Sequence, residues 1–531
     1  MYLKLIVLFS VAALVTGCST GTPKETKRPN ILFIMSDDHA YQAISAYDNT
    51  LTTTPNIDRI AKEGMLFTNA CVTNSICAPS RAVLLTGKHS HINGKVDNRF
   101  PFDTTQVTFP QIMQQAGYQT AMFGKLHFGN NPKGFDQFRI LDDQGSYYAP
   151  DFFTKNEGKI NVKGYTTDII TDMTIDWLDK ERKLDKPFLL MYFHKAPHRE
   201  WFPAPRHQKE YISKTFPEPA TLFDQFETRG TAAKTAEMNL VDHMNWAGDS
   251  KIYPDVMDKL GLKPYMKWDI SAFEREYNGM TQEERESWDR HYRPMNEKFV
   301  QAYPNMSRED LMHWRYQRYM QDYLGCIASV DEGVGRVLDY LDESKLVDNT
   351  IVVYTSDQGF YLGEHGWFDK RFAYNESFKT PLLIRWPNVV KPGITNDEMV
   401  QNLDFAQTML EAAGIVPPDD MQGESLVPIL KGEVEKVRDA AYYHYYEYPS
   451  IHMVKRHYAI ITKAYKLIHF YYDVDEWEFY DRKKDPYEIN NVYDDPAYAE
   501  VVQELKSALE ALRIKYEDSA ELDQKYIEAY K

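Results

Sequence analysis

The chain has 531 residues, of which 43% are hydrophobic, enough for one large domain with an appendage or for several ordinary domains. Its net charge is −17 and it has no long basic run, which argues against nucleic acid as the main partner. An anionic substrate remains compatible with this charge, because Lys, Arg and His side chains can still form a local positive pocket.

The first residues have the pattern of a targeting segment. An apolar run from Leu5 to Val15 is too short for a comfortable membrane span. It ends in VTGC, which resembles the bacterial lipobox, whose cysteine is lipidated; an ordinary signal peptide with a chance cysteine is the alternative. We expect a lipoprotein signal peptide over 1–18, lipidation at Cys18 and a flexible tether over 19–28. The protein would then be anchored in the bacterial cell envelope, on the periplasmic face or the outer-membrane surface.

Lipidation of Cys18 would leave three cysteines, so at least one has no intrachain partner. Cys71 and Cys326 lie in apolar surroundings and are predicted to be packed thiols. Cys77 lies in the segment NSICAPSRAVLLTG, a polar-flanked loop that runs directly into an apolar helix start. Its thiol could be a nucleophile, a redox group or a packed loop residue.

Short apolar runs that end in polar residues predict strands buried on both faces of a parallel sheet, at 28–36, 186–194 and 349–356. Helical patterns lie between them, at 109–117, 167–180 and 319–342. This alternation predicts an α/β sheet with helices on both faces. Ligands of such sheets bind beyond the carboxyl ends of the strands.

Two later segments differ from the rest in composition and hydrophobic pattern. Residues 220–318 are polar and weakly periodic, and we interpret them as an inserted excursion with helices rather than as a separate domain. After about residue 435, alternating aromatic runs predict an antiparallel sheet, followed by a closing helix over 497–516 and a terminal tail.

Polar residues follow two of the predicted strands. Asp37 and Asp38 come after the first, and Asp357 and Gln358 come after another. Four oxygen donors of this kind suit Ca²⁺ or Mg²⁺, and the lack of a His-rich or Cys-rich set argues against zinc. Asp at a strand end is also a common helix cap or turn former, so this spacing alone leaves metal binding open.

The segment CAPSRAVLLTG resembles the signature of the type I, formylglycine-dependent sulfatases. Further segments match that family in the correct order: NILFIMSDDH, GKLHFG, APH and TSDQGFYLGEHGWFDKR. The resemblance implies an alkaline-phosphatase-like α/β sandwich, with a large mixed sheet flanked by helices and a small C-terminal antiparallel-sheet subdomain. The catalytic domain would span 29–435, including the insertion at about 220–318, and the subdomain 436–531.

The resemblance also implies the chemistry. Cys77 would be converted to formylglycine by a formylglycine-generating or anaerobic maturation enzyme, for which Pro79 and Arg81 form part of the recognised motif. One Ca²⁺ would be held by Asp37, Asp38, Asp357, Gln358 and the modified Cys77, with Gln358 one methylene longer than the family's usual Asn. The remaining catalytic residues would be Arg81, Lys125, His127, His198 and Lys370.

Several segments, among them TGKHSHINGKVDNR, resemble bacterial carbohydrate sulfatases that are N-acetylglucosamine-6-sulfatase-like or act on marine polysaccharides. We therefore expect hydrolysis of the O-sulfate esters of a sulfated polysaccharide or its oligosaccharides. Candidate sugar contacts are His91, Asp97, Asn98, Arg99, Arg456 and His457. The alternatives are a phosphate or phosphonate ester hydrolase of the same fold, and a catalytically dead sulfoglycan-binding protein.

Overall fold

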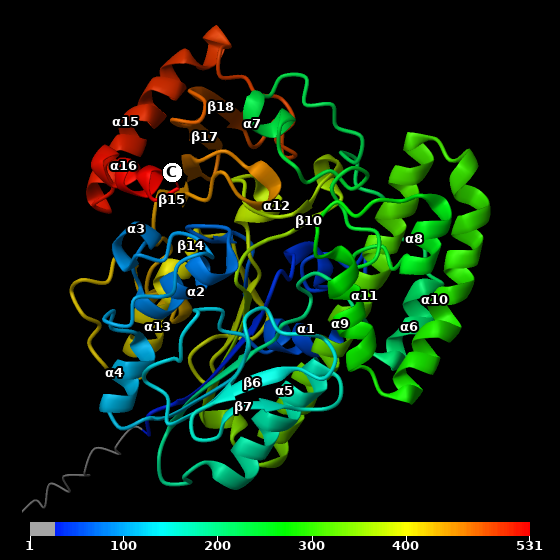
Figure 1. Cartoon of the computed structure of the whole chain (residues 1–531). Helices are drawn as coiled ribbons and strands as arrows, with labels where there is room; N and C mark the ends of the chain where they lie inside the picture. Colours follow the sequence, from blue (N-terminus) through cyan, green and yellow to red (C-terminus); the bar gives the residue numbers. More distant parts are fainter. Residues whose placement is uncertain (1–26, 531) are drawn as a thin grey trace, which may run out of the picture.

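The computed structural model describes residues 27–530 (Figure 1). The predicted signal peptide, the lipidation site Cys18 and residues 19–26 of the tether lie outside the described residues. Between residues 27 and 530, no helix combines the length and the apolar character needed to span a membrane.

A ten-stranded mixed sheet forms the centre of the fold, in the order β13-β2-β12-β9-β1-β8-β4-β5-β6-β7. Its middle is parallel: β1 (Asn30–Ser36) lies between β8 (Phe188–Phe193) and β9 (Thr350–Ser356), and β4 (Gln119–Gly124) lies beside β8. The three strands predicted from apolar runs are therefore confirmed, and β1 pairs with both of the others. The other strands are β2 (Met65–Phe67), β5 (Gln137–Leu141), β6 (Asp151–Thr154), β7 (Gly158–Asn161), β12 (Leu382–Arg385) and β13 (Ile394–Asn396).

Both faces of the sheet are buried, which explains why its strands are continuously apolar. Leu32 and Ile34 of β1 face a core that includes α1 (Pro55–Lys62), α5 (Thr166–Asp176) and α11 (Arg308–Glu343). Phe33 and Met35 face a second core with α2 (Cys77–Thr86), α4 (Phe109–Gln115) and α13 (Phe405–Ala412). The three predicted helices are confirmed, although α11 begins earlier than expected, where Ser307 and Asp310 form a capping box.

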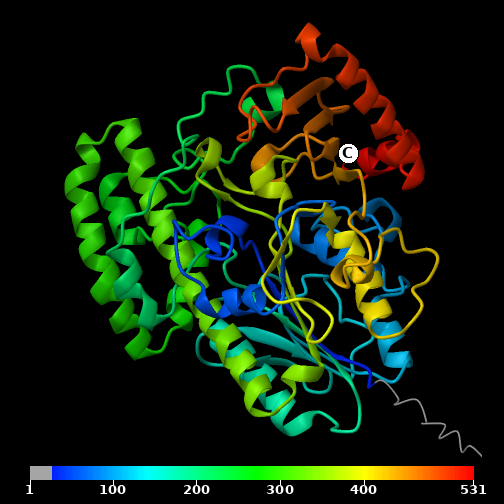
Figure 2. The same cartoon turned by 180° about the vertical axis from the view of Figure 1, so that it is seen from behind.

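The segment 220–318 contains α8 (Pro254–Leu260), α9 (Asp269–Gly279) and α10 (Gln282–Ala302), which form one flank of the molecule with α6 (Pro205–Ile212) and α11. Figures 1 and 2 show this flank in green. The boundaries of a catalytic domain at 29–435 and of a subdomain at 436–531 stay predictions.

The predicted antiparallel sheet near the end of the chain is confirmed, with the order β15-β16-β17-β18. Its strands are β15 (Ala440–Tyr445), β16 (His457–Thr462), β17 (Tyr465–Phe470) and β18 (Glu476–Asp481), and α15 (Ala499–Lys515) packs on them. The predicted terminal tail is wrong: residues 520–528 form helix α16 (Ala520–Glu528). Ser519 caps this helix, and Tyr526 and Ile527 are buried on its inner side.

Candidate active site

The predicted catalytic residues gather at one edge of the parallel strands. Asp37 directly follows β1, Asp357 follows β9, Lys125 follows β4, and the segment 194–198 follows β8. Asp38 has a left-handed backbone, with φ of 63°, and its N–H donates to Asp357 Oδ1 at 3.1 Å. This turn lets the adjacent side chains of Asp37 and Asp38 converge, whereas in a strand they would point to opposite faces.

Three buried carboxylates and one buried amide form the centre of the site, and none is more than 1% exposed: Asp37, Asp38, Asp357 and Gln358. Burial raises the pKa of Asp38, and the neighbouring Asp37 and Asp357 raise it further, against the opposing effect of Lys370. Burial likewise raises the pKa of Asp357. Asp37 Oδ1 and Gln358 Oε1 have no hydrogen-bond partner. Unpaired oxygens among like charges are unfavourable in a protein interior, so this donor set fits a hard divalent cation.

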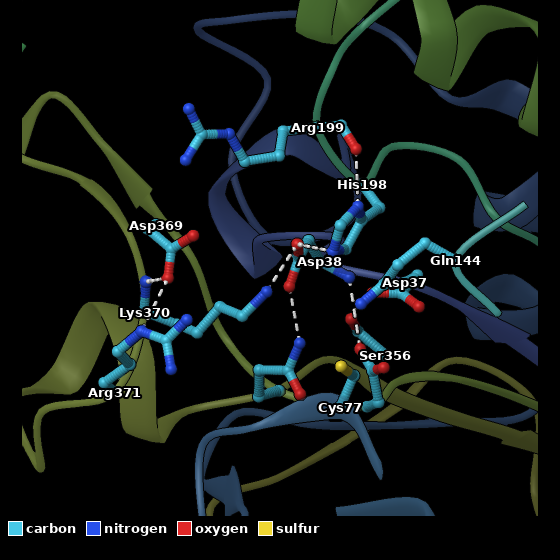
Figure 3. A network of polar contacts seen from close by, with 12 residues as sticks. Asp37, Asp38, Cys77, Gln144, His198, Arg199, Ser356, Asp369, Lys370 and Arg371 are labelled. Atoms are coloured by element: carbon cyan, nitrogen blue, oxygen red, sulfur yellow. Dashed lines mark hydrogen bonds and ion pairs between the residues drawn. The ribbon is translucent and has the colours of Figure 1, made fainter. Parts of the chain in front are cut away.

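Buried cations surround these carboxylates. Arg81 Nη2 lies 2.9 Å from both Asp37 Oδ2 and Asp357 Oδ2, and Lys125 also contacts Asp37. Lys370 Nζ lies 2.8 Å from Asp38 Oδ2 (Figure 3). Burial alone would raise the pKa of Asp37, but Lys125 and Arg81 outweigh it and lower that pKa. The site thus keeps positive groups next to a carboxylate cluster, as binding of an anion beside a cation requires.

Cys77 is the first residue of α2, so its side chain lies at the positive end of a helix. Its Sγ is 3.2 Å from His127 Nδ1 and 3.5 Å from Asn98 Nδ2. Burial would raise the pKa of the thiol, but His127 and Lys125 outweigh burial and lower the pKa to about 6. Of the three readings left open by the sequence, this setting favours a reactive residue. Cys71 and Cys326 are also buried, but there burial raises the pKa of each thiol to about 12, as expected of packed thiols.

Two histidines have their orientation fixed by neighbours. The ring of His127 is held at Nε2 by Gln144 at 3.2 Å and by Asp143 at 3.1 Å. His198 donates from Nδ1 to the carbonyl of Arg199 at 2.5 Å, and its Nε2 lies 3.8 Å from Asp38 Oδ2 (Figure 3). His127 therefore lies next to Cys77, and His198 lies near Asp38.

A cavity of about 540 Å³ opens over Cys77, with His198 and Lys370 in its wall. It also exposes polar and aromatic residues that the sequence reasoning did not single out: Asp143, Gln144, Lys195, Arg199, Glu200, Trp268, Arg275, Asp369, Arg371 and His452. Asp369 and Arg371 could have been found, because they flank Lys370 in the sequence. Trp268 and Arg275 come from the segment 220–318 and carry no comparable signal.

Of the predicted sugar contacts, only Asn98 lines this cavity. His91 is held at Nε2 by the carbonyl of Tyr516 at 2.7 Å and at Nδ1 by the hydroxyl of Tyr446 at 3.0 Å. His457 accepts from the Ala373 N–H at 3.1 Å.

Arg456 lies away from the cavity as well and pairs with Asp473 at 2.5 Å. His91, Arg456 and His457 therefore lie outside the cavity lining, with protein partners for their polar atoms, and their contact with a sugar stays a prediction. Asp97 and Arg99 are also absent from the cavity lining, and they contact the last residues of the chain.

Comparisons with known proteins agree with these motifs. A family model described as Sulfatase matches residues 29–415, and one described as N-sulphoglucosamine sulphohydrolase, C-terminal, matches residues 363–515. The chain is 47% identical to an N-acetylglucosamine-6-O-sulfatase of Bacteroides thetaiotaomicron, over 97% of this chain and 91% of that protein. It is 25% identical to an ulvan-active sulfatase of Formosa agariphila, over 95% of this chain and 85% of that one.

The fold is also that of a solved protein. The structure of a protein in complex with its substrate D-glucosamine-2-N,6-O-disulfate superposes with a TM-score of 0.89 and 47% sequence identity. The match covers 94% of this chain and all of that one. The mixed sheet, the flanking helices and the C-terminal antiparallel sheet are thus common to both proteins.

Proposed function

The chain belongs to the sulfatase family, and on that premise we propose that it hydrolyses the 6-O-sulfate ester of sulfated glucosamine in glycosaminoglycan oligosaccharides. The observation that carries the choice of sugar is the nearly full-length similarity to an N-acetylglucosamine-6-O-sulfatase. The more distant similarity to an ulvan-active enzyme makes a marine polysaccharide the less favoured substrate.

We infer that Cys77 is matured to formylglycine and that one Ca²⁺ is held by Asp37, Asp38, Asp357 and Gln358, together with residue 77. The unpaired oxygens of Asp37 and Gln358 and the buried carboxylates support the cation. Turning the terminal amide of Gln358 would direct Oε1 to the ion in place of Nε2, which now donates to Asp38. When present, the two groups supply an oxygen nucleophile and a polarising divalent charge.

The chain's own residues then bind the sulfate and move protons. Arg81, Lys125 and Lys370 are buried side chains that supply fixed positive charge for the sulfate oxygens. His127 Nδ1 lies next to residue 77 and can take a proton from it.

His198 presents Nε2 on the side of Asp38 and is our candidate acid for the leaving oxygen. Burial lowers the pKa of His198 in the free site, and an anionic sulfate beside it favours the protonated form.

The outer part of the cavity suits a sugar. Its volume of about 540 Å³ lies in the range of small-ligand sites. Asp369 and Arg371 offer charged hydrogen-bonding groups on either side of Lys370 in the sequence, and Trp268, from the segment 220–318, offers an aromatic ring. We propose that these residues hold the glucosamine ring while its 6-O-sulfate lies against residue 77.

The proposal also includes export. The lipobox-like VTGC sequence supports lipidation of Cys18 and anchoring at the cell envelope, where oligosaccharides from polysaccharide breakdown would be encountered.

The test is sulfate release from defined sugars by protein made with a formylglycine-generating enzyme. The panel holds N-acetylglucosamine 6-sulfate, glucosamine 2-N,6-O-disulfate, a 3-O-sulfated isomer, a sulfated ulvan oligosaccharide and a phosphate ester, with Cys77→Ala as control. We expect release only from the two 6-O-sulfated glucosamines and none from the control. Preferred hydrolysis of the ulvan fragment or the phosphate ester would overturn the proposal.

A further inference from the structure

Asp97 and Arg99, two predicted sugar contacts that do not line the cavity, contact the last described residues of the chain instead. Tyr530 donates its hydroxyl to Asp97 Oδ2 at 2.5 Å, and its ring lies 3.3 Å from the guanidinium carbon of Arg99. Four residues earlier, Tyr526 donates to the carbonyl of His91 at 3.1 Å. Helix α16 and Tyr530 are therefore attached to the segment that leads from α2 to residue 99, more than four hundred positions away in sequence.

The carboxylate of Asp97 organises the short loop 97–99. It is fully buried, and its Oδ1 accepts from the backbone N–H groups of Arg99 at 2.9 Å and Phe100 at 3.3 Å. Its Oδ2 accepts from Arg99 Nε at 3.2 Å and from Tyr530. Buried carboxylates are stable only when such bonds are complete, so the loop's shape depends on all four.

Asn98 is the residue that this loop delivers to the active site. It follows Asp97 directly, lines the cavity and lies 3.5 Å from Cys77 Sγ through Nδ2. We propose that Tyr530 is a positioning residue: by binding Asp97 and covering Arg99, it holds Asn98 against residue 77. A residue that follows helix α16 thereby contributes to the order of the surroundings of residue 77 without lining the cavity.

The protein with an unconverted thiol allows a test that needs no sulfatase activity. Cys77 lines the cavity but is only 1% exposed, and the described cysteines Cys71 and Cys326 are 0% exposed, so the rate of alkylation by iodoacetamide reports how accessible each thiol becomes. We expect Tyr530→Ala to raise the alkylation rate of Cys77 by about ten-fold or more, since a hydrogen bond to a buried charge is lost. The rates of Cys71 and Cys326, followed on their own peptides by mass spectrometry, should not change.

Two further variants separate the effect of the Tyr530 hydroxyl from the effect of the Tyr530 ring and from that of helix α16. Tyr530→Phe keeps the ring over Arg99 and loses only the bond to Asp97, so it should give a smaller rise in the Cys77 rate. Tyr526→Phe is the matched control: it removes one hydroxyl from helix α16, four residues before Tyr530, but that hydroxyl binds His91 rather than Asp97. Its Cys77 rate should equal that of the parent.

The second readout is turnover by the matured enzyme, and this part rests on the proposed function. We expect Tyr530→Ala to lower kcat by about ten-fold with a smaller change in KM, since Asn98 lies at the reacting residue. An unchanged Cys77 rate in Tyr530→Ala, or a parallel rise at Cys71 and Cys326, would overturn the inference. A missing sulfatase activity with the expected alkylation pattern would count against the proposed function alone.

Discussion

Lys370 illustrates how much a single side chain contributes at this site. It is 3% exposed, and its Nζ lies 2.8 Å from Asp38 Oδ2. We expect Lys370→Ala to lower kcat/KM by about 10²- to 10³-fold, because a fixed charge facing the transition state is lost. Steady-state kinetics on N-acetylglucosamine 6-sulfate measure this. Lys431→Ala, at an exposed position, is the control, and a comparable loss there would discredit the assignment.

The carboxylate cluster predicts a dependence on calcium. A strong chelator should abolish turnover, and added Ca²⁺ should restore it, since Asp37, Asp38 and Asp357 would otherwise repel one another. The melting temperature should rise with Ca²⁺ concentration, because the ion binds only the folded chain. Asp357→Asn should weaken the calcium dependence of both quantities. Full turnover in the chelator, with no shift in melting temperature, would rule out this site.

At the scale of residues, the order of the motifs along the chain indicated the site, which no single motif could do alone. Asp37 and Asp357 could equally have been helix caps, and only their place among five ordered segments indicated a shared site. The sugar contacts stay predictions: His91 and Arg456 lie in segments that match the family, but they do not line the cavity and their partners lie elsewhere in the chain. Trp268 could not be found, since an aromatic residue in a polar segment has no spacing that marks it.

Asp331 joins two elements and gives a prediction at that scale. Its carboxylate, on helix α11, accepts hydrogen bonds from two backbone N–H groups at the start of α1: that of Asn56 at 3.0 Å and that of Ile57 at 2.8 Å. Asp331→Asn removes acceptor oxygen at a buried helix end and should cost about 1–3 kcal/mol of the free energy of unfolding. Urea unfolding measures this. Asp339→Asn is the control on the same helix, where the side chain is 63% exposed and the expected cost is below about 1 kcal/mol.

The same residue predicts the direction of a pH effect. Burial raises the pKa of Asp331 to about 6, from 3.8 in the reference state. The folded chain therefore holds the proton more tightly than the unfolded chain, and this contribution to stability is lost as the pH rises through about 6. Between about pH 4 and pH 7 the parent should lose more stability than Asp331→Asn. An equal pH dependence in the two proteins would contradict the assignment.

The elements could be predicted where their pattern was local. The apolar runs of β1, β8 and β9 are long enough to show burial on both faces, and the sequence predicted them correctly. The sequence predicts a tail where helix α16 lies, because the stretch is polar and Tyr526 and the following Tyr530 find their partners near residues 91–99, far away in sequence. The strand order could not be read from local patterns, since parallel strands pair across long crossovers.

For the whole molecule, the N-terminal sequence predicts attachment to a membrane through a lipid on Cys18. Cys18→Ser should move the protein from the membrane fraction to the soluble fraction of the exporting cell, because the thiol that carries the lipid is removed. Fractionation and immunoblotting measure the distribution. Cys71→Ser, which leaves the lipobox intact, is the control, and an unchanged membrane fraction for Cys18→Ser would contradict lipid anchoring.

The whole chain also combines a net charge of −17 with a cationic group around Cys77. An acidic surface disfavours non-specific capture of polyanions, while Arg81, Lys125 and Lys370 attract a sulfate locally. This contrast explains why composition argues against nucleic acid as the main partner but cannot identify an anionic substrate.

The central claim is that a formylglycine made from Cys77 carries out sulfate hydrolysis. The most direct measurement compares preparations with different degrees of maturation, scoring the thiol and the aldehyde in the Cys77 peptide by mass spectrometry. Turnover of N-acetylglucosamine 6-sulfate should rise in proportion to the aldehyde fraction and should extrapolate to zero without it. Full turnover by a preparation that carries only the Cys77 thiol would contradict the account.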